Sequence, residues 1–168
     1  MSIHVPVGLT TEGLLAKRYM ARFIDGMLLS CVAFATSFLV ARWMPDSFAS
    51  AVTLLLSGLL IVLLWLGYET LLESSTWQAT LGKRIMGLKV YDEKGGPLTL
   101  PQAAGRNLVK DGPFLLFSLF PGAQLLSVAW LGAHLVVLHR SPVSQAIHDR
   151  AARTWVAAPE GTLQLHIN

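Results

Sequence analysis

Two long stretches of this chain contain almost no ionisable side chain. Residues 26–41 carry none apart from Cys31, and residues 49–66 carry none at all. A helix rises about 1.5 Å per residue, so about 20 such residues cross the roughly 30 Å hydrocarbon core of a bilayer. These stretches predict membrane-spanning helices over about residues 20–40 and 49–72, joined by a short linker as an antiparallel hairpin.

The composition supports this interpretation. Hydrophobic residues make up 53% of the chain, and charged residues make up 14%, against about 25% in soluble domains. We therefore predict an integral membrane protein, one domain over residues 1–168, with the lipid bilayer as its main partner. The single cysteine excludes an internal disulfide and a multi-cysteine metal site. The net charge of +3 is assigned to cytoplasmic loops, so no nucleic-acid partner is expected.

The basic residues predict the orientation. Lys17, Arg18 and Arg22 precede the first apolar stretch, and six more lysines and arginines lie between residues 73 and 112, whereas the first linker has only Arg42. Basic loops stay on the cytoplasmic side of the membrane. We expect a cytoplasmic N-terminus and a cytoplasmic segment over residues 73–101, in a bacterial inner membrane.

The last third of the chain leaves the number of crossings open. A helix over residues 112–139 would be about 42 Å long, which is long for one span and short for two. Two crossings result if residues 102–120 form a short or re-entrant helix and residues 123–139 form another. A cytoplasmic tail, residues 140–168, then keeps its three arginines inside. This favours four segments over three.

The cytoplasmic segment contains a short amphipathic pattern. We expect an interfacial helix that begins near Thr80, with Lys83 and Arg84 at the lipid headgroups. The apolar residues expected to face lipid are Leu81, Ile85, Met86 and Leu88. Neither a metal nor any other cofactor is predicted, because His134 and His139 have no third candidate ligand nearby.

Two β-like runs follow in the same segment. Residues 87–92 and 97–100 flank turn residues and predict a short β-hairpin. Residues 154–157 are another short β-like run, and if it pairs with the hairpin, both must lie on one side of the membrane. Thr99 and Gln102 have the spacing of a capping box, which predicts the start of the helix that carries Arg106.

Charged residues at the membrane surface are the candidate site. Arg18, Arg22 and Asp25 share one helical face. Charged side chains in or just under the bilayer surface are energetically costly, so a helix that keeps them usually has a use for them. They form either a structural ion pair or a ligand- or ion-linked cluster. Asp149 either anchors an arginine, Arg18 or Arg106, or orients His148 as part of a proton shuttle.

Several motifs together resemble one family of small membrane proteins. They are Arg18-x-x-Ala21-x-x-Ile24-Asp25, Thr80-Leu81-Gly82-Lys83-Arg84, Gly87-Leu88-Lys89-Val90, Arg106-Asn107 and His148-Asp149. The set is similar to the RDD family, whose name denotes one arginine and two aspartates, here Arg18, Asp25 and Asp149. The resemblance implies three transmembrane segments and a suspected role in transporting ligands.

The expected fold class is an all-α membrane protein, a bundle of three or four segments with an interfacial helix and a cytoplasmic β-hairpin. The sequence contains no hydrolase elbow, His-Glu-x-x-His or paired-cysteine motif, so we do not expect an enzyme. One hypothesis is an ion-coupled carrier, functioning as a homo-oligomer or with a membrane partner. The other is a non-transporting adaptor of a membrane complex. The residues expected in the charge cluster or pathway are Arg18, Arg22, Asp25, Glu69, Arg106 and Asp149.

Overall fold

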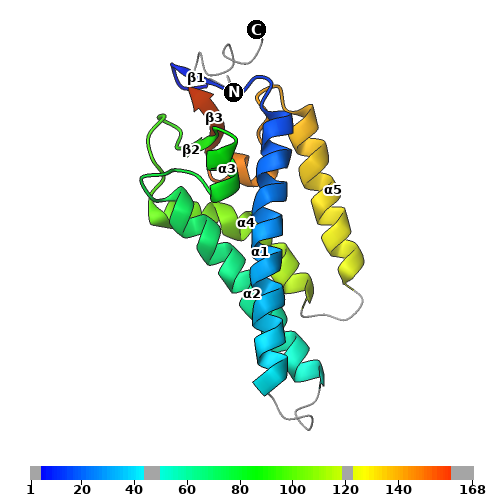
Figure 1. Ribbon diagram of the computed structural model, residues 1–168. Helices are drawn as coiled ribbons and strands as arrows, with labels where there is room; N and C mark the ends of the chain where they lie inside the picture. Colours follow the sequence, from blue (N-terminus) through cyan, green and yellow to red (C-terminus); the bar gives the residue numbers. More distant parts are fainter. Residues whose placement is uncertain (1–4, 44–49, 119–122, 160–168) are drawn as a thin grey trace.

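The computed structural model describes residues 5–43, 50–118 and 123–159. Within these ranges the chain forms six helices and three short strands (Figure 1). Four of the helices are long, and the strands gather at one end of the molecule, next to the start of the first helix (Figure 1).

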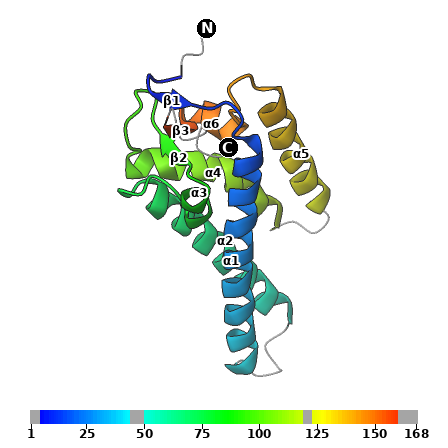
Figure 2. The same ribbon diagram turned by 45° about the horizontal axis from the view of Figure 1, so that its top comes forward.

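The long helices form where the apolar pattern predicts them. They are α1 (Leu15–Trp43), α2 (Ser50–Glu73), α4 (Leu100–Ser118) and α5 (Gln124–Arg140). In both views the α1–α2 pair extends well beyond the α4–α5 pair (Figures 1 and 2). Among the described residues, one helical stretch, Leu15–Leu39, is long and apolar enough to cross a membrane, and Leu125–Arg140 is apolar but shorter.

The predicted β-hairpin is wrong. Strand β2 (Lys89–Tyr91) pairs with β3 (Trp155–Pro159), which also pairs with β1 (Leu9–Thr10), and all pairs are antiparallel. The late run forms the strand β3 and pairs with β2, with Val90 opposite Val156.

The segment after β2 turns away from the sheet. The Asp92 side chain closes the turn by accepting a hydrogen bond from the Gly96 N–H at 2.6 Å. Pro97 has no N–H to donate to a neighbouring strand. The predicted capping box is confirmed, because Gln102 accepts from the Thr99 N–H at 3.0 Å and Thr99 from the Gln102 N–H at 3.4 Å. The chain therefore enters α4 instead of returning as a strand.

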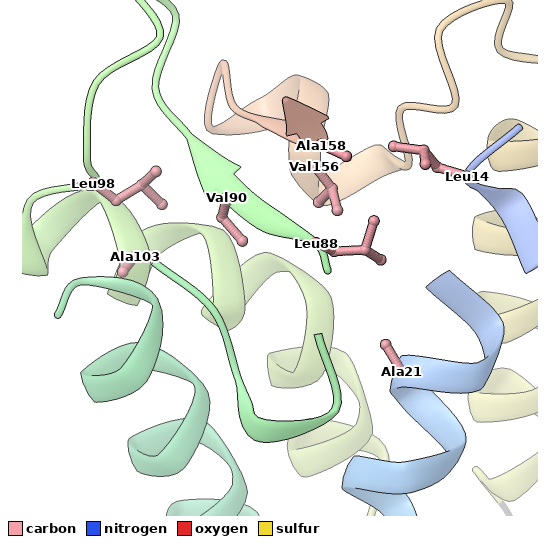
Figure 3. Packing of buried hydrophobic residues seen from close by; sticks show 8 residues of the cluster. All are labelled: Leu14, Ala21, Leu88, Val90, Leu98, Ala103, Val156 and Ala158. Carbon is pink, nitrogen blue, oxygen red and sulfur yellow. The ribbon is translucent and has the colours of Figure 1, made fainter. Parts of the chain in front are cut away.

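The largest buried apolar cluster lies between the sheet, α1 and α4 (Figure 3). It contains Leu14, Ala21, Leu88, Val90, Leu98, Ala103, Val156 and Ala158. Leu88 is 1% exposed, which corrects the expectation that it faces lipid, and Met86 also packs against this cluster. Met86 and Leu88 both follow the short helix α3 (Leu81–Ile85). The directions of their side chains are therefore set by the backbone that leads into β2. Leu81 and Ile85 are exposed, as expected.

Helix α3 rests directly on α1. A Cβ atom added to Gly82 would lie 2.2 Å from the backbone oxygen of Ala21, which is far inside van der Waals contact. The Thr80 side chain caps the helix by accepting from the Lys83 N–H at 3.4 Å, as the sequence predicts. Only glycine allows the two backbones to approach this closely.

Candidate functional site: a buried ion-pair network

Three helices each carry a pair of like charges four residues apart. These pairs are Arg18 and Arg22 on α1, Glu69 and Glu73 on α2, and Arg106 and Lys110 on α4. Residues at this spacing lie on one helix face, so each helix presents one charged stripe. The acidic stripe of α2 meets basic groups of both other helices. A buried charge is tolerated when it is paired and hydrogen-bonded, and this arrangement provides both.

Asp149 is the centre of the network at the sheet end. It is fully buried and lies in the short helix α6 (Ile147–Ala151). One carboxylate oxygen accepts from Arg18 at 2.6 Å and the other from Arg106 at 2.7 Å. Both arginines named as candidate partners therefore bind it. The Ala146 N–H also donates to Asp149 at 3.0 Å, which ties the start of α6 to the same carboxylate.

The charges around Asp149 decide its ionisation. Burial alone raises the pKa of this carboxyl, but the positive charges of Arg18 and Arg106 hold the pKa well below its usual range. A carboxylate stabilised in this way stays ionised at neutral pH. Asp149 is therefore a permanent anion that links α1, α4 and α6.

Glu73 and Arg106 form the inner part of the network. The Arg106 side chain is 1% exposed and donates to Glu73 at 2.6 Å. Glu73 also accepts from Asn107 at 3.2 Å and pairs with Lys83. The Lys83 ammonium therefore lies within the network, away from the headgroup position that the sequence suggested. Arg84 is exposed, and its guanidinium carbon lies 4.0 Å from the centre of the Trp77 ring.

A second group of charges borders the open side of the network. Glu69 is 1% exposed and accepts from Arg22 at 2.5 Å, and it also pairs with Lys110. Asp111 accepts from Arg22 at 3.2 Å through one oxygen. Its other oxygen has no hydrogen-bond donor among the described residues and lies 3.5 Å from the Lys110 ammonium. Asp111 is the least completely bonded carboxylate of the network.

Asp25 does not form the expected ion pair with Arg18 or Arg22. Its carboxylate, 1% exposed, accepts from the Thr80 hydroxyl at 2.6 Å, the Tyr68 hydroxyl at 2.8 Å and the Gly82 N–H at 2.8 Å. The arginines on its own helix bind acids on α2, α4 and α6 instead. Neutral donors can satisfy a buried carboxylate when they are fixed in place, so Asp25 fastens α3 and α2 to α1.

Two histidines extend the network toward α5. His134 on α5 and His148 on α6 stack with their ring centres 5.2 Å apart. Burial lowers the pKa of His148 well below its usual value, although Asp149 opposes this, so this imidazole is neutral at pH 7. The charged groups that act on His148 are Asp149 on its own helix, Arg106 and Lys110 on α4, and Arg18 on α1.

A cavity of about 180 Å³ lies beside the network, between α1, α4, α5 and α6. One wall consists of network side chains, including Arg22, Lys110 and Asp111, together with both stacked histidines. The other wall is apolar and includes Phe114, Leu131, Leu135 and Leu138. The structure thus places an amphipathic space against the charged groups.

Five of the six residues predicted for the cluster are in the ion-pair network, and the sixth, Asp25, has neutral partners. Members that were missed in that role include Glu73, Lys83, Lys110, Asp111 and the neutral partner Thr80. A signal for two of them was present, because Glu73 and Lys110 each follow another predicted member by four residues on the same helix face. Asp111 and Thr80 had no such signal, because their roles depend on how the helices pack.

The long apolar helix and the charged network buried beside it define a helical membrane protein. The profile of the RDD family matches residues 13–153, and the chain belongs to this family, as its motifs predict. An uncharacterised protein of Bacillus subtilis (strain 168), YxaI, is 29% identical over 104 residues, which cover 53% of this chain and 69% of that protein. No solved structure matches the chain.

Proposed function

We propose that this RDD-family protein is a small ion-coupled carrier. The observation that supports the proposal is the cavity of about 180 Å³ that lies between the helices and shares a wall with the ion-pair network. A carrier needs a place for its cargo within the bundle and a charged group whose state changes during the cycle. Asp111 and Glu69 border the cavity and provide such groups.

The network divides into structural and coupling parts. Asp25 and Asp149 are saturated by donors and tie three elements together, so we assign them a structural role. Asp111 has one oxygen without a hydrogen bond and is the coupling group of the proposal. Its removal leaves Arg22 and Lys110 paired with Glu69, so the fold should tolerate Asp111→Asn.

The proposed topology has four crossings, by α1, α2, α4 and α5, with a cytoplasmic N-terminus in a bacterial inner membrane. Two observations support it. The starts of α1 and α4 and the ends of α2 and α5 lie toward the sheet end of the molecule (Figures 1 and 2). Most lysines and arginines belong to those helix ends or to the segments that follow α2 and α5. Cysteines at Glu12, Glu93 and Arg153, in a Cys31→Ser background, should be labelled from the cytoplasmic side. Labelling of any of them from outside contradicts this topology.

Flux through liposomes tests the carrier function. The purified, monodisperse protein should move protons or a monovalent cation when a pH or sodium gradient is imposed. Asp111→Asn should abolish the flux while the oligomeric state is unchanged. The matched control is Glu93→Gln, because the Glu93 side chain is 66% exposed and does not line the cavity. Full flux in Asp111→Asn would remove Asp111 from the mechanism.

The alternative is a non-transporting adaptor that assembles with another membrane protein. The exposed face of α3, where Leu81 is 37% and Ile85 62% exposed next to the sheet, supports this alternative. An adaptor requires the network only for folding. The absence of any flux in a correctly oriented wild-type preparation, together with loss of cellular activity in a Leu81→Ser, Ile85→Ser double variant, would favour the adaptor.

A further inference from the structure

The cavity beside the network is large enough for one small molecule. Its volume is about 180 Å³, and an engineered apolar cavity of about 150 Å³ holds benzene. Its apolar wall, with Phe114, Leu131, Leu135 and Leu138, would contact a hydrocarbon group of that size. The polar wall then decides which head group accompanies the hydrocarbon.

The cations of the polar wall already have partners. Arg18 and Arg106 bind Asp149, Arg22 and Lys110 bind Glu69, and Lys83 binds Glu73. An anionic ligand would have to compete with each of these buried carboxylates. The cavity therefore does not present an unpaired positive charge among the described residues.

On the wall of this cavity, the buried atoms without a hydrogen-bond partner among the described residues are acceptors, whereas the unpaired indole N–H of Trp65 lies outside this wall. The Nδ1 atom of His134 lies 3.2 Å from the Trp130 carbonyl oxygen, which only accepts, so Nδ1 carries the proton and Nε2 is a bare acceptor in the neutral ring. The Nε2 atom of His148 lies 3.4 Å from the Asp149 carboxylate, which by the same logic leaves its Nδ1 as an acceptor. Neither His134 Nε2 nor His148 Nδ1 has a hydrogen-bond partner among the described residues.

These acceptors are buried on the cavity wall. His134 is 9% exposed and His148 is 7% exposed, and both line the cavity. The second oxygen of Asp111, also on this wall, is a third acceptor without a hydrogen bond. Buried acceptors without a donor are costly, and an ammonium group, with three donors and no acceptor, matches this set.

We infer that the cavity binds a small organic amine, with its ammonium group donating to the free nitrogens of His134 and His148 and its hydrocarbon group against the leucines of α5. The inference rests on the proposed carrier function, for which it names the substrate class. Binding is measured without transport. A protein that binds the amine but shows no flux therefore fails only the carrier proposal, and one that shows flux but does not bind the amine fails only this inference.

Calorimetric titration of the wild-type protein in lipid nanodiscs is the first test, with empty nanodiscs as the reference. The probes are benzylamine, toluene and benzoate, which share one ring and differ in head group. Benzylamine should bind at least about tenfold more tightly than either of the others, as expected for one charge-assisted hydrogen bond. Equal binding of toluene indicates an apolar crevice only, tighter binding of benzoate indicates an anion site, and absence of benzylamine binding indicates a cavity filled by water. Each of these results overturns the inference.

Variants locate the site. His134→Phe keeps an aromatic ring and removes the acceptor, so it should weaken benzylamine binding at least about tenfold and leave toluene binding unchanged. Leu131→Trp should block both probes by filling the cavity. The matched control is Val136→Trp, because Val136 is 50% exposed on the same helix and does not line the cavity. Unchanged benzylamine affinity in monodisperse His134→Phe or Leu131→Trp protein would place binding elsewhere.

Discussion

Neutralising Asp149 should destabilise this protein more than neutralising an exposed acid. One Asp149 oxygen accepts from Arg106 at 2.7 and 3.2 Å, and the other accepts from Arg18 at 2.6 Å and from the Ala146 N–H at 3.0 Å. The side-chain amide introduced by Asp149→Asn would turn an NH₂ donor toward groups that are themselves donors. Removing one partner of a buried ion pair costs about 3–5 kcal/mol, and we expect Asp149→Asn to lose free energy of unfolding in this range.

The assay is unfolding in mixed micelles titrated with a denaturing detergent, followed by circular dichroism. The control is Glu93→Gln, because Glu93 and its partner Arg153 are 66% and 72% exposed and lie 3.8 Å apart. An exposed pair of this kind contributes at most about 1 kcal/mol. The reasoning is refuted if Asp149→Asn unfolds at the same detergent fraction as Glu93→Gln.

The pH dependence of this difference checks the same interpretation. The folded-state pKa of Asp149 lies well below its usual range, whereas the unfolded value is about 3.9. The stabilisation is therefore complete above about pH 4 and is lost as the pH falls through the folded-state pKa. The difference in unfolding free energy between wild type and Asp149→Asn should stay constant from neutral pH down to about pH 4 and shrink below it.

Three further outcomes follow from other parts of the fold. Gly82→Ala should cost about 1–3 kcal/mol, because the new methyl group meets the backbone of α1, whereas Gly105→Ala, with open space at its Cβ, should be neutral or stabilising in the same unfolding assay. Leu88→Ala should cost about 2–5 kcal/mol as a buried residue, and equal stability of Leu88→Ala and Ile85→Ala would place Leu88 outside the core. The buried His148 is neutral in the folded protein, whereas in the unfolded chain it takes up a proton as the pH falls below about 6.5. The free energy of unfolding should therefore fall by up to about 1.4 kcal/mol per pH unit in that range. His148→Phe should flatten this slope.

Local sequence was sufficient to predict the four long helices. In an apolar environment, the backbone N–H and C=O groups of the charge-free residues 26–41 and 49–66 must be hydrogen-bonded within the protein. A helix provides these bonds within one segment. The start of α4 was predicted by the capping box at Thr99, because a cap joins residues only three positions apart. The N-cap at Thr80 was predicted for the same reason.

The strand pairing depended on the tertiary structure. Turn residues after Tyr91 favoured a local hairpin, but β2 pairs with β3, more than 60 residues later. A short strand has too few residues to specify its partner by itself, so the partner is decided by what else packs nearby. Here Val90 and Val156 lie in one apolar cluster with Leu14 of the N-terminal arm, and that cluster places the strands side by side.

Part of the charge cluster was predictable from the sequence, and its pairing was not. Costly charges beside apolar runs identified Arg18, Arg22 and Asp25 as important. Their spacing on one helix suggested that they pair with one another, yet Asp25 binds Thr80, Tyr68 and Gly82 instead. Hydrogen-bond geometry extends only about 3 Å, so the partner of each charge is decided by the approach of one helix to another. The sequence by itself identified six of the polar groups that meet between the helices, and only the packing of α1, α2, α3, α4 and α6 decided which groups bind them.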